Sequence, residues 1–310
     1  MDFVVCGEAL IDLAPLAGAQ GTFETPWAAR CAGGPMNTAI GLARLGETVQ
    51  FAGRLSHDAF GHQLHTHLRA NDVGVEFITR ASGPTALAVV SLDDDQRADY
   101  AFHLNHTATF GWSPGELPVL RPEQWLHLGS LATVVAPGAG VLLEWAGGHT
   151  GPISLDLNIR PAVIPDPGDY WNRVEPWLEL LAHHSGVVRA SAEDIDYLAA
   201  ASGEHGTATR VMAHWWERFG FAHGVVTLGP EGAYAIDERG GETFVPGLVI
   251  DVVDTVGAGD TFMAGFLAAF AHNPQVGPAL AQGVRAGAYA CGQVGPQPPT
   301  LADLEQMTRP

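Results

Sequence analysis

Residues 254–267 read Asp-Thr-Val-Gly-Ala-Gly-Asp-Thr-Phe-Met-Ala-Gly-Phe-Leu, a loop of small residues followed by an apolar helical segment. Gly257, Ala258 and Gly259 allow a ligand to approach the backbone, and the first turn of a helix offers N–H groups without intrahelical partners. Such a terminus attracts anions, including the charge that develops on a phosphoryl group in transfer. Asp260 stands at the same terminus, where the helix dipole favours its carboxylate. The stretch predicts an anion site with a base beside it, although Asp is equally common as a simple helix cap.

On either side of this stretch, short β-branched runs alternate with segments of helical spacing. Strand-like runs occur at residues 3–7, 49–53, 125–128, 153–157, 186–189 and 224–228. Helical patterns occur at residues 35–45, 58–71, 138–146, 170–182, 192–200, 210–220 and 261–271. The alternation predicts an α/β fold with a central, mostly parallel sheet flanked by helices.

Two stretches interrupt the alternation, at about residues 13–31 and 85–104. Both resemble short strands without crossover helices, and Asp93-Asp94-Asp95 is typical of a hairpin turn. Antiparallel strands inserted in a parallel fold often form a lid, so we expect one domain over residues 1–310 with a small antiparallel β lid. The Pro-rich segment 296–300 is expected either to end the structured chain or to cap a helix.

The composition excludes several classes of protein. The formal net charge is −19, which argues against nucleic acid or an anionic membrane as a partner. All 15 basic residues are arginine, so the chain has no lysine for a Walker A loop, a protein-kinase strand or a Schiff base. Cys6, Cys31 and Cys291 are scattered, no basic leader precedes the first strand, and no apolar run reaches about 18 residues. A cytoplasmic protein is expected.

Two motifs, in order and far apart in the chain, resemble the signatures of the ribokinase/PfkB family of carbohydrate kinases. Residues 254–267 resemble the carboxy-terminal signature, and residues 31–46 (CAGGPMNTAIGLARLG) resemble the amino-terminal one. Residues 7–12 (GEALID), 53–61 (GRLSHDAFG) and 226–233 (VTLGPEGA) are similar to further segments of the family. The resemblance implies a ribokinase-like fold over nearly the whole chain.

The resemblance also implies a reaction, ATP-dependent phosphorylation of a sugar hydroxyl with Mg²⁺. Asp260 would be the base, and Gly257, Ala258 and Gly259 would form the anion hole. The remaining positions implied by the resemblance are Asp12, Gly33, Gly34 and Asn37 for the sugar, Thr227, Gly229 and Gly232 for ATP, and Asp254 for a monovalent cation such as K⁺.

Two segments near strand ends add further candidates. Asp156 to Pro161 (DLNIRP) follows a strand, where open α/β sheets place ligands, so Asn158 is a candidate for substrate binding. Because the chain has no lysine, Arg160 is the candidate cation for the transferred phosphate. Ser191 and Asp194 stand at the spacing of the Asn-x-x-Glu pair with which the family organises Mg²⁺ and phosphate. A helix-capping box would explain this pair equally well.

The choice of substrate stays open among several sugars. The spacing of residues 34–37 and the DLNIRP segment resemble the fructokinase branch, while ribose, 2-keto-3-deoxygluconate and nucleosides remain alternatives. A different class, a non-catalytic sugar or nucleotide sensor, is also compatible with the fold. We expect His103, Asn105 and His106 of the lid to decide the sugar, and the exposed lid sheet to allow a homodimer.

Overall fold

The computed structural model of the protein describes residues 1–16, 23–92, 98–184 and 186–307. The hairpin turn expected at Asp93-Asp94-Asp95 lies outside the described residues. The strands are β1 (Asp2–Cys6), β2 (Leu10–Pro15), β3 (Trp27–Ala32), β4 (Thr48–Ala52), β5 (Arg54–Ser56), β6 (Thr79–Ala81), β7 (Leu87–Leu92), β8 (Ala98–His103), β9 (Trp125–Gly129), β10 (Ile153–Asp156), β11 (Val187–Ser191), β12 (His223–Thr227), β13 (Gly232–Ile236) and β14 (Glu242–Pro246). The α-helices are α1 (Gly34–Arg44), α2 (Ala59–Ala70), α3 (Gly138–Gly147), α4 (Pro167–Leu181), α5 (Ala192–Ser202), α6 (Ala208–Phe219), α7 (Ala258–His272), α8 (Val276–Cys291) and α9 (Leu301–Met307).

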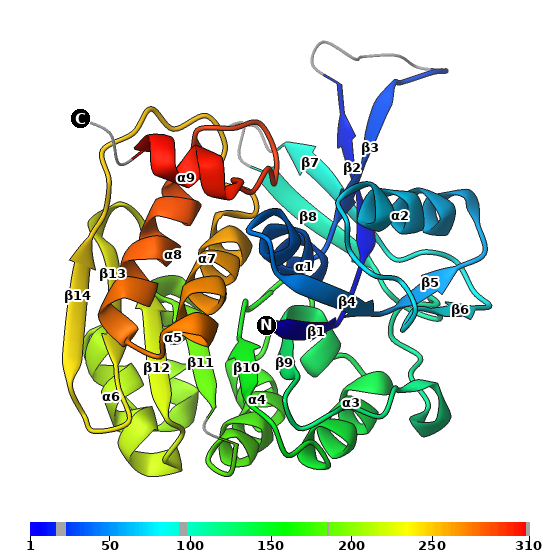
Figure 1. Ribbon diagram of the computed structural model, residues 1–310. Coiled ribbons are helices and arrows are strands. Elements are labelled where there is room, and N and C mark those ends of the chain that lie inside the picture. Colours follow the sequence, from blue (N-terminus) through cyan, green and yellow to red (C-terminus); the bar gives the residue numbers. More distant parts are fainter. Residues whose placement is uncertain (17–22, 93–97, 185, 308–310) are drawn as a thin grey trace.

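A central eight-stranded sheet confirms the predicted α/β class (Figure 1). Its order is β14-β13-β12-β11-β10-β9-β1-β4, and all neighbours from β12 to β4 are parallel. β13 and β14 add an antiparallel edge beyond β12. The carboxyl ends of the parallel strands therefore open onto one edge, the usual place for ligands in such sheets.

Helices cover both faces of the sheet, and each face has its own apolar core (Figure 1). One core joins the sheet to α1, α2, α7 and α8, and the other joins it to α3, α4, α5 and α6. The parallel strands are consequently buried on both sides, which explains why β1 (DFVVC) and β11 (VVRAS) are nearly continuous in apolar residues.

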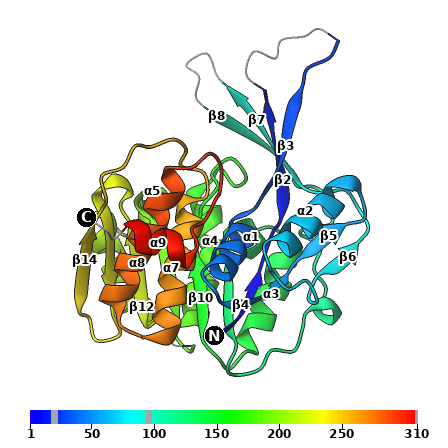
Figure 2. The same ribbon diagram turned by 45° about the horizontal axis from the view of Figure 1, so that its top comes forward.

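The lid is a separate four-stranded sheet, in the order β3-β2-β7-β8, that projects from the body (Figure 2). The outer pairs, β3 with β2 and β7 with β8, are antiparallel as expected, whereas β2 and β7 pair in parallel where the two hairpins meet. The lid begins at Leu10, so Asp12 belongs to the lid strand itself. Leu10 and Ala88 are buried together with Phe110 and Leu131 in a small third core at the lid base.

Two details differ from the sequence-based expectation, and a third decides between two stated alternatives. α7 begins at Ala258, three residues early, with Gly257 as its cap, so Asp260 lies in the first turn and is not the helix cap. α8 was not predicted. It packs closely against α7, since a Cβ on Gly265 of α7 would lie 2.6 Å from Ala286 Cβ. The segment 296–300 precedes α9 and caps it, since Thr300 Oγ1 accepts from the Asp303 N–H over 3.3 Å.

Candidate active site

Two neighbouring cavities open at the carboxyl ends of the parallel strands. The first, of about 450 Å³, lies between the lid and the body. The second, of about 720 Å³, lies between the ends of β11 and β12 and helices α7 and α8. Arg189, Ser191, Thr255 and Gly259 line both cavities, so the two spaces meet at the loop before α7. This geometry can hold two ligands with their reacting groups side by side.

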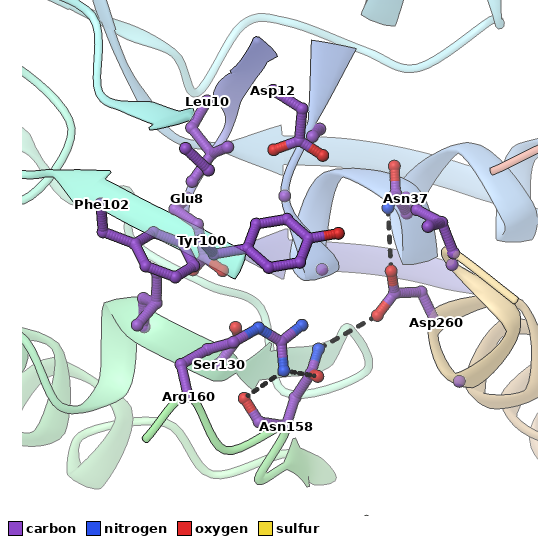
Figure 3. A pocket seen from close by; sticks show the side chains of 18 of the residues that line it. Glu8, Leu10, Asp12, Asn37, Tyr100, Phe102, Ser130, Asn158, Arg160 and Asp260 are labelled. Atoms are coloured by element: carbon purple, nitrogen blue, oxygen red, sulfur yellow. Dashed lines mark hydrogen bonds between the residues drawn. The ribbon is translucent and has the colours of Figure 1, made fainter. Parts of the chain in front are cut away.

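The first cavity collects most of the residues expected to bind a sugar. They come from the lid, from the start of α1, from the turn after β10 and from the start of α7 (Figure 3). The predicted residues that line it are Asp12, Gly33, Gly34, Asn37, Asn158, Arg160, Ser191, Asp194, Gly257, Gly259 and Asp260. Segments separated by more than 200 residues thus meet around one space.

Asp260 is held by two amide side chains in the first cavity (Figure 3). Asn37 Nδ2 donates to Asp260 Oδ2 over 2.8 Å, and Asn158 Nδ2 donates to Oδ1 over 3.1 Å. The residue is only 7% exposed, and burial raises the pKa of its carboxyl above the ordinary value, while Asn37 and Arg160 oppose the rise. A raised pKa makes this carboxylate a stronger base than an exposed aspartate.

The turn after β10 places Asn158 and Arg160 against Asp260. Asn158 adopts a left-handed backbone conformation with φ of 44°. Its Oδ1 accepts from Arg160 Nη1 over 2.6 Å, so the amide bridges a guanidinium and the Asp260 carboxylate. Asp194 Oδ1 accepts from the Ile159 N–H over 2.8 Å and fixes the middle of the turn.

Gly34, the first residue of α1, lies so close to Asn158 and Asp260 that there is no room for a side chain. A Cβ on Gly34 would lie 2.6 Å from Asn158 Nδ2 and 3.1 Å from Asp260 Oδ1. Any larger side chain would therefore push Asn158 or Asp260 from its position.

Two further carboxyl groups line the first cavity, Asp12 from lid strand β2 and Glu8 from the loop after β1. Burial raises the pKa of Asp12 to about 6, and Arg160 and Arg30 oppose this rise. Glu8 is almost completely buried, and its Oε2 accepts from the Ala132 N–H over 3.0 Å. Burial raises the pKa of Glu8 as well. The cavity thus offers hydrogen-bond acceptors on both sides, as a molecule with several hydroxyls requires.

The second cavity has a polar end and an apolar end. Thr227, Gly229, Gly232, Ser191 and Ala258, all expected to bind nucleotide or phosphate, line it. The loop from Gly247 to Val252 and the α8 residues Val284 and Cys291 provide apolar surface. Such a wall suits a flat heteroaromatic ring, and the polar end near α7 suits phosphates.

The helix termini at the junction of the cavities are shaped for anions. Gly257 caps α7 with φ of 77°. The Ala258 N–H donates to the Thr255 carbonyl over 3.2 Å, whereas the Gly259 N–H has no hydrogen-bond acceptor among the described residues. α5 begins at the same place: Ser191 caps it, and Asp194 Oδ2 accepts from the Ser191 N–H over 2.8 Å. The predicted capping box is therefore present, and both Asp194 oxygens already bind backbone N–H groups.

Asp254 lies outside both cavities, in the loop before α7. Its Oδ1 accepts from the Val256 N–H over 3.0 Å, and its Oδ2 accepts from the Gly295 N–H over 2.9 Å. It thereby ties the loop before α7 to the loop after α8.

The comparisons with known proteins agree with this geometry. The model of the pfkB family carbohydrate kinases matches residues 2–303. The chain belongs to the pfkB family of carbohydrate kinases. Members transfer a phosphoryl group from ATP, and the two adjoining cavities of this kinase match that use.

The most similar relatives include bacterial fructokinases. The fructokinase of Rhizobium leguminosarum bv. trifolii is 36% identical over 270 residues, which cover 85% of this chain and 78% of the relative. The fructokinase of Klebsiella pneumoniae is 31% identical over 274 residues, which cover 86% and 83%. The ATP-bound fructokinase of Xylella fastidiosa is 26% identical with a TM-score of 0.84, over 99% of this chain and 97% of that one. The kinase is therefore a fructokinase-like member of its family.

Sequence reasoning chose the wrong lid residues. His103, Asn105 and His106 line neither cavity, whereas Tyr100 and Phe102 of β8 line the first one. Alternate residues of a strand point to opposite faces, and the pairing of β8 with β7 decides which face meets the cavity. The even-numbered aromatic residues of β8 were the available signal, because aromatic rings commonly pack against the apolar faces of sugars.

Sequence reasoning also missed Glu8, Ser130 and Arg189, which line the first cavity of the kinase. Glu8 and Ser130 lie just after the buried parallel strands β1 and β9, and Arg189 is the third of the five residues of β11. A polar residue within or just after an otherwise apolar strand is the signal that could have found them.

Proposed function

We propose that this kinase transfers the γ-phosphoryl group of Mg-ATP to a hydroxyl of fructose. The sequence relationship to the Rhizobium leguminosarum fructokinase supports fructose over the other sugars. The observation that carries the mechanism is the Asp260 carboxylate, held between Asn37 and Asn158 at the point where the two cavities meet. On this assignment the 450 Å³ cavity is the sugar cavity and the 720 Å³ cavity is the nucleotide cavity.

In the proposed reaction Asp260 accepts the proton of the attacking hydroxyl. That oxygen forms the new bond to the γ-phosphorus, the bond to the β–γ bridging oxygen breaks, and its electron pair leaves with ADP. The Gly259 N–H group and the α7 dipole stabilise the charge on the phosphoryl oxygens. Burial raises the pKa of the Asp260 carboxyl, so its carboxylate takes up the hydroxyl proton more readily than an exposed aspartate would.

The lid residues Asp12, Tyr100 and Phe102 enclose the sugar in this proposal. Asp12 accepts hydrogen bonds from sugar hydroxyls, and the two rings, stacked at 6.1 Å between centroids, cover an apolar face. Enclosure excludes water, which would otherwise compete for the phosphoryl group.

The residues present fit the two cations that we assign to the site. Mg²⁺ keeps several waters and needs few protein carboxylates, so Glu193, which lines the nucleotide cavity, together with Asp194 through water, suffices to hold Mg-ATP. Mg²⁺ supplies charge neutralisation for the phosphates. A K⁺ ion is assigned to the loops that Asp254 joins, where the carboxylate of Asp254 would supply oxygen ligands.

A panel assay tests the proposed function. ADP release is measured with Mg-ATP and fructose, ribose, tagatose, 2-keto-3-deoxygluconate or adenosine, for the wild type and for Asp260→Asn. We expect turnover with fructose that falls roughly 10²–10⁴-fold in the variant, the usual contribution of a general base. If the kinase phosphorylates another sugar of the panel and not fructose, that sugar replaces fructose as the proposed substrate.

Binding measurements on Asp260→Asn separate an enzyme from a sensor. The variant should keep its affinity for sugar in calorimetry, because the amide preserves the shape of the cavity. Absence of turnover with every sugar, combined with thermal stabilisation by one of them, would instead identify a non-catalytic binding protein.

The lid is also assigned as a dimer contact. Phe23 is 99% exposed and Trp27 of β3 is 44% exposed, so the described part of the lid carries apolar surface of the kind that interfaces bury. Light scattering after gel filtration measures the mass; a monomer at micromolar concentration would reject the assignment.

A further inference from the structure

Arg189 occupies the one place in the site where a cation faces both ligands. Of the arginines that the structure describes, Arg160 lines the sugar cavity alone, and Arg189 lines the sugar cavity and the nucleotide cavity. Arg189 is the third of the five residues of β11, two residues before Ser191 at the carboxyl end of this strand in the middle of the sheet.

The guanidinium of Arg189 is fixed by its neighbours. Nη1 contacts both oxygens of Asp156, over 2.9 and 3.1 Å, and Nη2 donates to Thr227 Oγ1 over 2.6 Å. Arg189 is 5% exposed. Burial lowers the pKa of Arg189, but Asp156 and Asp194 outweigh this effect, so the group stays charged. Nε has no hydrogen-bond partner among the described residues.

The same guanidinium lies directly against the anion-binding loop. A Cβ on Gly259 would be 2.9 Å from both Nη1 and Nη2 of Arg189. The absence of a side chain at Gly259 therefore allows the cation to lie against the first turn of α7. The positive charge of Arg189 also favours the ionised form of Asp260, so it opposes the rise in the pKa of that carboxyl.

We propose that Arg189 is a catalytic residue whose guanidinium stabilises the phosphoryl group while that group passes from ADP to the sugar oxygen. The inference rests on the proposed function. Arg189 supplies the positive charge that a lysine provides in other phosphotransferases and that this lysine-free chain cannot provide in that way. The planar donors of arginine suit the phosphoryl oxygens, and the pairing with Asp156 holds the group in position before ATP arrives.

This role differs from the one that Arg160 plays. Arg160 reaches Asn158 and approaches Asp260 from the sugar side, so it acts on the base and on the accepting sugar. Arg189 acts on the transferred group from the nucleotide side. A purely structural Arg189 would only neutralise the buried Asp156, and the test must separate these two cases.

The test uses Arg189→Lys, Arg189→Met and the double variant Asp156→Asn/Arg189→Met. We expect kcat to fall roughly 10²–10³-fold in Arg189→Met, the usual loss when one preorganised transition-state donor is removed. Arg189→Lys keeps the positive charge but loses the planar guanidinium donors, so a smaller fall in kcat is expected. KM for the sugar should stay within about threefold in both, because Arg189 contributes little to the ground-state sugar contacts.

The double variant decides between catalysis and structure. It removes the buried unpaired carboxylate that Arg189→Met leaves, so the melting temperature should recover relative to that single variant. If Arg189 is catalytic, kcat stays low in the double variant although stability returns; recovery of kcat to near the wild-type value would overturn the proposal. The double variant and Arg189→Lys still decide if Arg189→Met fails to fold.

Two controls complete the experiment. Arg173→Met removes a partly buried arginine that donates to the Val134 carbonyl over 2.9 Å outside both cavities, and kcat should not change. All rates are measured with whichever panel sugar the wild type phosphorylates best, so rejection of fructose leaves the test of Arg189 intact. An unchanged kcat in a folded Arg189→Lys and in the double variant would reject a catalytic Arg189 while the kinase assignment stands.

Discussion

The side-chain amide of Asn158 donates to Asp260 Oδ1 over 3.1 Å from a backbone held at φ of 44°. Left-handed φ values are costly for residues with a side chain, and asparagine tolerates them better than most. The strain at Asn158 places its amide between Arg160 and the base. The turn after β10 therefore belongs to the proposed catalytic site as well as to the connections of the fold.

Replacement of Asn158 separates its backbone role from its hydrogen bonds. Asn158→Gly keeps the left-handed conformation but loses the amide, so kcat should fall roughly 10-fold to 100-fold, because a hydrogen bond to a charged group contributes about 1.5–3 kcal/mol. Asn158→Ala should lose the same activity and, in addition, about 1–2 kcal/mol of stability relative to the glycine variant. Steady-state kinetics and urea unfolding measure the two effects; equal stability of the two variants would contradict the strain at this position.

Asp12 should make sugar binding depend on pH. Burial raises its pKa to about 6, so the carboxylate protonates as the pH falls through 6 and loses an acceptor for sugar hydroxyls. KM for the sugar should therefore rise below pH 6, by at most about tenfold per pH unit. The rise should be absent in Asp12→Asn, whose KM is high throughout.

Ionisation of Asp12 favours sugar binding but lowers the stability of the fold. Its folded pKa lies above the value of 3.8 for an unperturbed aspartate, so ionisation destabilises the fold above pH 6, and this cost is relieved as the pH falls through 6 towards 3.8. Asp12→Asn should accordingly melt at a slightly higher temperature than the wild type at pH 8 and not at pH 4. A lower melting temperature at pH 8 would show that the carboxylate stabilises the empty fold.

Gly34→Ala should impair catalysis with little effect on the fold. The added Cβ would lie 2.6 Å from Asn158 Nδ2, and the required shift would misplace the base by a few tenths of an ångström or more. Displacements of about 1 Å can cost about 10²-fold in rate, so a fall of roughly 10-fold to 100-fold in kcat is expected. The matched control is Gly140→Ala in α3, where a Cβ meets nothing within 4 Å; it should retain full activity and gain about 0.5–1 kcal/mol.

Nucleotide should protect Cys291 from alkylation. Cys291 lines the nucleotide cavity, and burial raises the pKa of its thiol, with Asp254 adding to the rise. Labelling with iodoacetamide should thus be slow, and Mg-ADP should slow it further in proportion to the fraction of enzyme that remains free. Peptide mass spectrometry follows Cys291 and, as an internal control, Cys31 of lid strand β3, whose rate should not respond. Equal labelling of Cys291 with and without Mg-ADP would place the nucleotide elsewhere.

The sequence by itself determined the α/β class, the lid and most of the residues around Asp260. Buried parallel strands require continuous apolar runs, and a glycine-rich helix start has few other uses, so both features are local and visible in the chain. The surroundings of Asp260 were not local. Its carboxylate is bound by Asn37 and Asn158, which lie 223 and 102 residues away along the chain, and the proposal of Asp260 as a base rests on this arrangement.

Only the tertiary structure decided the remaining parts of the site. Arg189 belongs to an apolar strand and becomes a site residue because β11 lies between β10 and β12, where Asp156 and Thr227 hold it at the junction of two cavities. Which lid residues face the first cavity depended on strand pairing, since a shift of one residue exchanges the two faces. Long-range packing positions these side chains, and no short pattern of residues records it.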